Sequence, residues 1–129
     1  MDVANILAEV DMKYPNDVDE AHKWGWITQM EKLLLNECLL THELSEREMN
    51  KAAGIYAMEH ASSEYEPLAQ PPYQDVYIHY LGMQIALVNT DNEQYENEQT
   101  LYNNSLLAYK NWFNRTHRAK IAGGNKWRF

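Results

Sequence analysis

At 129 residues, this chain is long enough for one domain and too short for two independent hydrophobic cores. Hydrophobic residues make up 45% of it and charged residues 23%, which excludes a wholly disordered chain. The formal net charge is −8, and the single cysteine, Cys38, excludes both an internal disulfide and a zinc site built from several thiolates.

The first third of the chain predicts two amphipathic helices. Residues 3–12 place apolar side chains three and four positions apart, and Asp2 stands where an N-cap residue would. A longer helix is predicted over residues 19–42, capped by Asp17 or Asp19. Its apolar face consists of Trp24, Ile27, Met30, Leu34, Cys38 and Thr41, widened by Trp26, Leu33 and Leu40. Cys38 is therefore expected in the core rather than at a reactive site.

The middle of the chain, residues 43–72, carries mixed signals. Ser45 and Glu48 form a capping-box pattern ahead of an alanine-containing stretch, and we expect a helix there although Gly54 interrupts it. Residues 66–72 contain three prolines, which lack a backbone N–H and restrict the residue before them. The sequence therefore predicts an extended or turned connecting arm over residues 66–72.

Two further helices are predicted after the prolines. The first spans residues 74–89, and the second begins near Asn92 and carries aromatic and apolar residues along one side as far as Phe113. These two helices should form an antiparallel hairpin, with their tyrosines in the core or at an interface. The predicted fold is all-α: a small bundle of about four helices with a long helix hairpin and an extended C-terminal tail.

The sequence contains no pattern typical of a metal or catalytic site. His22, His42 and His60 are isolated, and there is no His-Glu-x-x-His, Glu-x-x-His or Gly-x-Ser-x-Gly motif. Residues 123–126, Gly-Gly-Asn-Lys, superficially resemble a phosphate loop but lack a preceding strand and a following helix. We therefore expect no enzyme activity, no metal and no cofactor. No apolar run approaches the ~20 residues that cross a bilayer, so we expect no membrane partner, and the single cysteine fits a reducing, cytosolic origin.

Charge is distributed unevenly along the chain. Residues 1–98 contain all 19 acidic residues but only five of the 11 basic ones, so their net charge is −14. Residues 99–129 carry the other six basic residues and no acid, so their net charge is +6. This asymmetry indicates either a nucleic-acid contact or an end that docks on an acidic protein surface, including that of a neighbouring copy. A tail that stays solvated is the third possibility.

The stretch from Pro72 to His117 resembles a family of small proteins of tailed phages and prophages of Firmicutes, usually labelled head-tail connector or adaptor proteins. The matching residues are Pro72-Tyr73, Tyr77, Tyr80-Leu81, Ile85, Tyr95, Asn103-Asn104-Ser105, Tyr109, Trp112 and Asn114-Arg115-Thr116-His117, with Trp24 and Ile27 in the second predicted helix. The sequence departs from the family pattern at residues 43–65, which are more helical than the acidic loop of that pattern, and at residues 94–97.

The resemblance implies a helical structural protein that catalyses nothing and assembles as a ring, commonly a dodecamer, between the portal and the next neck component. We expect residues 1–117 to form this connector domain and residues 118–129 a basic arm. Head-to-tail assembly would use such an arm, because it is complementary to the acidic body. The expected contact residues are Arg115, His117, Arg118, Lys120, Lys126, Trp127, Arg128 and Phe129.

The expected partners are the portal protein, other neck or tail proteins and further copies of the chain, in the virion neck and, during assembly, in the host cytoplasm. Two alternatives stay open. In the first, the protein is a head-closure or tail-completion protein. In the second, it is a small nucleic-acid-binding protein whose basic tail binds the phosphate backbone. Because the acidic body would repel a duplex, DNA contact would involve the tail alone, and in a ring that tail would line a DNA channel.

Overall fold

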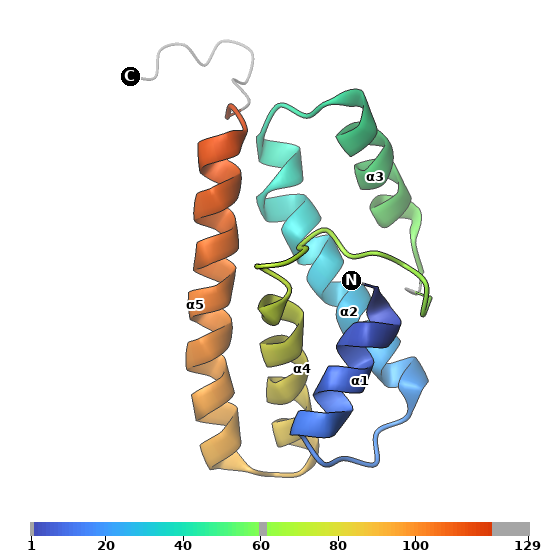
Figure 1. The fold of residues 1–129 in the computed structure, drawn as a ribbon, viewed down its shortest axis with the longest axis vertical. Helices are drawn as coiled ribbons and strands as arrows, with labels where there is room; N and C mark the ends of the chain where they lie inside the picture. The colour runs from blue at the N-terminus through green and yellow to red at the C-terminus, as the bar shows by residue number, and fades with distance from the viewer. Residues whose placement is uncertain (1, 60–61, 120–129) are drawn as a thin grey trace.

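Five α-helices make up the part of the chain that the computed structural model describes, residues 2–59 and 62–119 (Figure 1). They are α1 (Val3–Lys13), α2 (Glu20–Glu37), α3 (Glu46–Ala57), α4 (Asp75–Val88) and α5 (Asn92–Thr116), with a 3-10 turn, η1 (Leu39–Thr41), after α2. No strand occurs within those residue ranges, so the predicted all-α class is confirmed. The helix expected in the stretch with mixed signals, residues 43–72, is α3. With it, the described residues contain five α-helices, where the predicted bundle had about four.

Four of the helices begin at a residue whose side chain caps the first turn. Asp2, Asp19 and Asp91 each accept a hydrogen bond from the backbone N–H three residues further on, at 3.0 Å. The Ser45 hydroxyl accepts from the Glu48 N–H while the Glu48 carboxylate accepts from the Ser45 N–H, so the predicted capping box is confirmed. Each cap contributes about 1 kcal/mol. These local signals explain why the helix starts could be predicted from the sequence.

The end of α2 differs from the prediction, because the helix stops at Glu37 and not at residue 42. The Thr41 hydroxyl donates to the carbonyl oxygens of Glu37 and Cys38, at 3.1 and 3.0 Å. His42 Nδ1 donates to the same Cys38 oxygen at 2.7 Å. These side chains bond the last carbonyl groups of α2, so the chain tightens into η1 and leaves in an extended conformation at His42. Cys38 is the C-cap residue of α2 and lies in the core, as expected.

The predicted hairpin is formed by α4 and α5, which lie side by side and antiparallel (Figure 1). Thr90 adopts a positive φ of 53° in the turn between them, and the Asp91 N–H donates to Ala86 O at 2.9 Å. With 25 residues, α5 is about 37 Å long, whereas α4, with 14 residues, is about 21 Å long. The C-terminal part of α5 therefore extends past the start of α4 and lies near the corner where α2 leads into α3.

The hydrophobic core lies between α1, α2 and α4, with α5 along one side. Its fully buried members include Ile6, Ile27, Leu34, Tyr77 and Leu81. The connecting arm over residues 66–72 contains no helix, as predicted, and it continues a segment that crosses the bundle beside the start of α1 (Figure 1).

This crossing segment also supplies acceptors to α1. The Val3 N–H donates to Tyr65 O and the Ala4 N–H to Ser63 O, both at 3.0 Å. The first N–H groups of a helix have no partner within the helix, so these bonds attach the segment before the arm to the N-terminus of α1.

Candidate interaction surface at the C-terminal end of α5

The chain that leaves α5 is attached to the corner between α2 and α3. The Glu43 N–H donates to Arg118 O at 2.8 Å, and His42 and Ala119 form an isolated antiparallel β-bridge. These contacts pair residues 118 and 119 with residues 42 and 43. The first two residues of the expected basic arm are thus part of the folded bundle.

His117 anchors the end of α5 to α3. Its imidazole stacks on the Phe113 ring with centroids 3.8 Å apart and an interplanar angle of 4°, and its Nε2 lies 2.5 Å from a Glu48 carboxylate oxygen. Burial raises the pKa of Glu48, but the hydrogen bonds from the Ser45 N–H and from His117 outweigh it, so the pKa lies below its usual value. The ionised carboxylate is therefore favoured where it caps α3 and holds His117.

A second anchor joins the end of α5 to the chain after α2. His42 Nε2 is hydrogen-bonded to the Asn114 side chain at 2.7 Å, while its Nδ1 is held by Cys38 O. The rings of His42 and Phe113 are nearly perpendicular, with an interplanar angle of 83° and a centroid distance of 5.0 Å. His42 is buried, so this residue, isolated in the sequence, has a structural partner 72 positions away.

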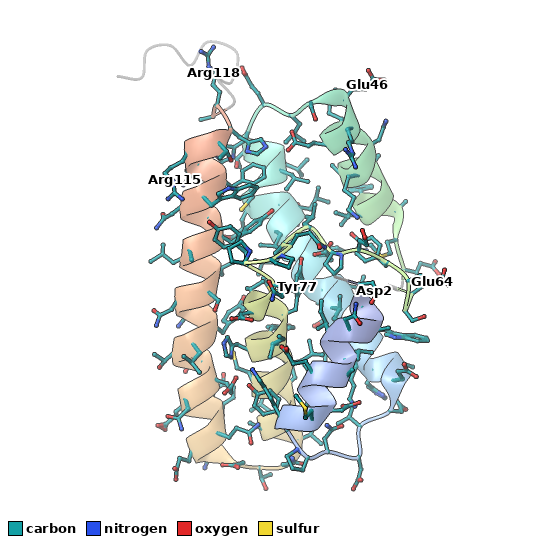
Figure 2. All side chains as sticks on the ribbon, in the orientation of Figure 1. Asp2, Glu46, Glu64, Tyr77, Arg115 and Arg118 are labelled. Atoms are coloured by element: carbon teal, nitrogen blue, oxygen red, sulfur yellow. The ribbon has the colours of Figure 1, made fainter. Side chains whose placement is uncertain are left out.

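The two arginines of this end point outward. Figure 2 shows Arg115 pointing away from the bundle at the side of the last turn of α5 and Arg118 just beyond the helix end, and both are exposed. Among the described residues neither guanidinium has an ion-pair partner, whereas Lys110, further back on α5, pairs with Glu37. An unpaired cation in the last turn of a helix also interacts favourably with the helix dipole. Arg115 and Arg118 thus form an exposed basic end held in place by two internal anchors.

The structure therefore divides the predicted contact residues into three groups. Arg115 and Arg118 are exposed and free to meet a partner. His117 is mostly covered and is engaged by Glu48, so its ring serves the fold. Lys120, Lys126, Trp127, Arg128 and Phe129 lie outside the described residues. Of the predicted element Asn114-Arg115-Thr116-His117, the first and last side chains bind to the bundle.

An aromatic groove of about 570 Å³ lies beside this end, between α3, the connecting arm and α5. Tyr109, Trp112 and Phe113 line one side, with Tyr73 packed against Tyr109 and Trp112 at centroid distances of 6.1 and 5.5 Å. Its other lining residues are Leu39, Arg47, Glu48, Asn50, Lys51, Glu66, Pro67, Leu68 and Gln70. The two basic and two acidic side chains balance each other, so the described lining of the groove has no net formal charge.

Two buried carboxylates are the site-like features that sequence analysis missed, and the first is Glu31 in α2. The Tyr65 hydroxyl donates to it at 2.6 Å, the Leu68 N–H donates at 3.0 Å, and the Tyr77 hydroxyl also donates to it. The Ala69 N–H donates in turn to Tyr77 at 2.9 Å. Burial raises the pKa of Glu31, although these hydrogen bonds act in the opposite direction. The cluster joins α2, α4 and the connecting arm. Figure 2 shows Tyr77 near the start of α4, inside the bundle.

The second buried carboxylate, Glu98 of α5, joins three parts of the chain. Tyr14 donates to it at 2.5 Å, and His79 Nδ1 of α4 lies 2.8 Å from the same oxygen. Burial and the contact with Glu98 raise the pKa of Tyr14 well above its usual value, so Tyr14 stays a neutral donor. A Cβ atom at Gly82 would lie 2.8 Å from the Glu98 oxygen and 2.9 Å from the Tyr14 ring, so any other residue there would have to displace one of these side chains.

Both glutamates occupy apolar positions of their helices. Glu31 falls four residues after Ile27 and three before Leu34, and Glu98 falls between Tyr95 and Tyr102 on the apolar side of α5. A charged residue on an apolar stripe is the signal that would have indicated a buried, hydrogen-bonded carboxylate.

In residues 2–59 and 62–119, no group of three or more His, Cys, Asp or Glu side chains could hold a metal ion. Within the same ranges no helix is both long enough and apolar enough to span a bilayer.

Comparisons with known proteins gave no relative: no family, no curated protein and no solved structure matches this chain. The fold and the surface define a small all-α bundle whose C-terminal helix ends in an exposed basic turn.

Proposed function

We propose that this protein is a structural head-tail connector subunit of a tailed bacteriophage, which assembles as a ring in the neck between the portal and tail components. Such a protein is a non-catalytic part of the virion, and it acts by binding neighbouring subunits through complementary surfaces. The observation that carries the proposal is the exposed basic end of α5, which has no ion-pair partner among the described residues, on a chain whose first 98 residues have a net charge of −14. The resemblance of residues 72–117 to connector proteins supplies the biological setting.

The arrangement of charge supports assembly between unlike surfaces. The turn at the opposite end of the α4–α5 hairpin contains Asp91 and Glu93, which have no ion-pair partner among the described residues. Arg115 and Arg118 lie about 37 Å away along α5. At that separation, several Debye lengths at physiological salt, the two ends do not neutralise each other. The acidic end and the basic end can therefore bind different partner surfaces. A heterologous interface, the kind that closes into a ring, joins two different surfaces of neighbouring subunits in this way.

The rigidity of the basic end also supports an interface. The last turn of α5 is held by His42 and Glu48, which come from two other segments of the chain. Because the backbone that carries Arg115 is already ordered, binding has to order only the side chain, so the entropy cost of association is smaller than for a free tail.

The test is the mass of the full chain by light scattering, alone and with the portal protein of the same phage, at low and moderate salt. Rings, or co-elution with the portal, that weaken as salt rises are expected, because salt screens exposed charge pairs. The variant Arg115→Glu should weaken portal binding at least about tenfold. Lys13→Glu is the matched control, since Lys13 is also an exposed base in the last turn of a helix, and α1 ends at the opposite end of the molecule from the end of α5 (Figure 1).

One alternative has a specific observation in its favour, the two exposed arginines at the end of α5. They would also suit a phosphate backbone, as in a small nucleic-acid-binding protein. A chain that stays monomeric, ignores the portal and retards DNA in a salt-dependent way would favour that function and overturn the connector proposal.

A further inference from the structure

An exposed apolar groove lies on the far side of the α2–α3 corner from the aromatic groove. It has a volume of about 360 Å³, and we call it the α2–α3 groove. It is lined by Leu35, Leu39, Leu40, Leu44, Met49, Ala52, Ala53 and Tyr56. Leu40, Met49 and Tyr56 are 48%, 53% and 78% exposed. The lining contains no charged side chain, and clustered apolar exposure of this kind on a small protein indicates a surface that is normally covered.

The chain itself delivers a segment to the edge of this groove. Ala119, the last described residue, is bridged to His42, which stands in the sequence between the lining residues Leu40 and Leu44. Ten residues follow, and an extended chain of that length reaches about 33 Å. The 12 residues of α3 are only about 18 Å long. Residues 120–129 are therefore long enough to cover the whole groove from where they start.

The composition of residues 120–129 matches the groove and its rim. Ile121, Trp127 and Phe129 are apolar and can fill an apolar surface, and Lys120, Lys126 and Arg128 are basic. The rim nearest to Ala119 is acidic, because Glu43 precedes Leu44 and Glu46 lies one turn before Met49 on α3. Figure 2 shows Glu46 at the outer end of α3, pointing away from the bundle, and among described residues neither glutamate has an ion-pair partner.

We propose that residues 120–129 of the same chain bind the α2–α3 groove in the free subunit, with Trp127 and Phe129 on its apolar lining and the basic side chains at its acidic rim. The attachment at Ala119 favours binding within one chain. A short tether gives the segment an effective concentration in the millimolar range, which exceeds the micromolar concentration of other copies by about a thousandfold. The inference does not depend on the proposed function. In a connector, it would keep the tail on its own subunit until a partner surface displaces it.

Disulfide trapping in the full chain tests this proposal. In the variant Met49→Cys/Asn125→Cys, one cysteine lies in the groove and the other in the tail, and Trp127 and Phe129 are left in place. The control variant is Leu107→Cys/Asn125→Cys. Leu107 is 57% exposed on α5, similar to Met49, and lies about 18 Å along the helix from Ala119, which is within reach of the tail. The native Cys38 stays unreactive, since burial raises the pKa of its thiol to about 11.

We expect the 49–125 disulfide to form within one chain at least about tenfold faster than the 107–125 disulfide under mild oxidation at micromolar protein. Non-reducing electrophoresis and peptide mass mapping distinguish disulfides within a chain from those between chains. The substitution Leu40→Asp in the first variant should lower its rate to that of the control. Equal rates in the two double-cysteine variants would overturn the proposal. A 49–125 disulfide that forms only between chains would overturn it too, and would identify a second copy as the source of the segment.

Discussion

Replacing Glu31 tests how the buried carboxylate contributes to the fold. In Glu31→Leu, a side chain of similar size removes the acceptor for Tyr65, Tyr77 and Leu68. Tyr65 is only partly buried, so its hydroxyl can turn to water. The Tyr77 hydroxyl and the Leu68 N–H still face position 31, and each unsatisfied donor costs about 1–3 kcal/mol. Relief of the carboxylate's own desolvation offsets part of this sum, so we expect a loss of about 2–3 kcal/mol in the free energy of unfolding.

The assay is urea unfolding followed by circular dichroism, with Glu37→Leu as the control. Glu37 lies on the same helix, but its pair with Lys110 is solvent-exposed and is expected to contribute less than about 1 kcal/mol. Both variants should stay folded, because a domain of this size has about 5–15 kcal/mol of stability. A Glu31→Leu protein as stable as the wild type, or more stable, would refute the reasoning, because it would mean that the donors of Tyr77 and Leu68 lose nothing when their acceptor is removed.

The loss caused by Glu31→Leu should depend on pH. Because the pKa of Glu31 is raised in the folded protein, the fold binds the proton of this carboxyl more tightly than the unfolded chain does. Its contribution to stability is therefore fully present below the unfolded pKa, near 4.5, and is lost as pH rises through the folded pKa. The difference between wild type and Glu31→Leu should thus be larger at pH 5 than at pH 7. A difference that shrinks as pH falls would show that the hydrogen bonds, and not burial, dominate this pKa.

Two further substitutions test how α5 is held. Gly82→Ala should lower the free energy of unfolding by about 1–3 kcal/mol, because its Cβ would lie 2.8 Å from the Glu98 carboxylate. Gly54→Ala is the control in the same thermal unfolding assay: a Cβ there meets nothing within 4 Å, so the variant should be neutral or stabilised by up to ~1 kcal/mol. Asn114→Ala removes the partner of buried His42 and should cost about 1 kcal/mol. Hydrogen exchange should then show faster opening at the end of α5 while the middle of that helix is unchanged. Uniform loss of protection along α5 would contradict this local role.

Much of the fold could be predicted because its determinants are local. Helix starts depend on a capping side chain and the three residues that follow, and the connecting arm depends on prolines that cannot donate. The apolar stripes of α4 and α5 are separated by a short turn, which leaves an antiparallel hairpin as the compact arrangement. In each case the residues that determine the structure lie within the helix, turn or arm itself, or directly beside it in the sequence.

The end of α2 could not be predicted, because its cause is not local. Apolar residues continue at helical spacing through Leu39 and beyond, so the pattern alone favours a longer helix. What stops it is the bonding of Thr41 and His42 to the last carbonyl groups, and His42 is held in that position by Asn114. No spacing rule connects residues 42 and 114. The same holds for Glu31, whose sequence position marks it as unusual but does not reveal that Tyr65 and Tyr77 supply its donors.

The candidate surface shows how the structure sharpens a prediction made from charge. The sequence places six basic residues and no acid after Glu98, but it does not distinguish the members that bind the chain itself from those that face outward. Of these six, the structure describes Lys110, Arg115 and Arg118. The neighbouring His117 is bound by Glu48. Lys110 is paired with Glu37, so among the described residues Arg115 and Arg118 are the exposed basic charges at the end of α5. An interface there would depend on those two residues more than on the sum of the charge. Variants at Arg115 and Arg118 should therefore change association far more than a substitution at Lys110, although all three carry the same charge.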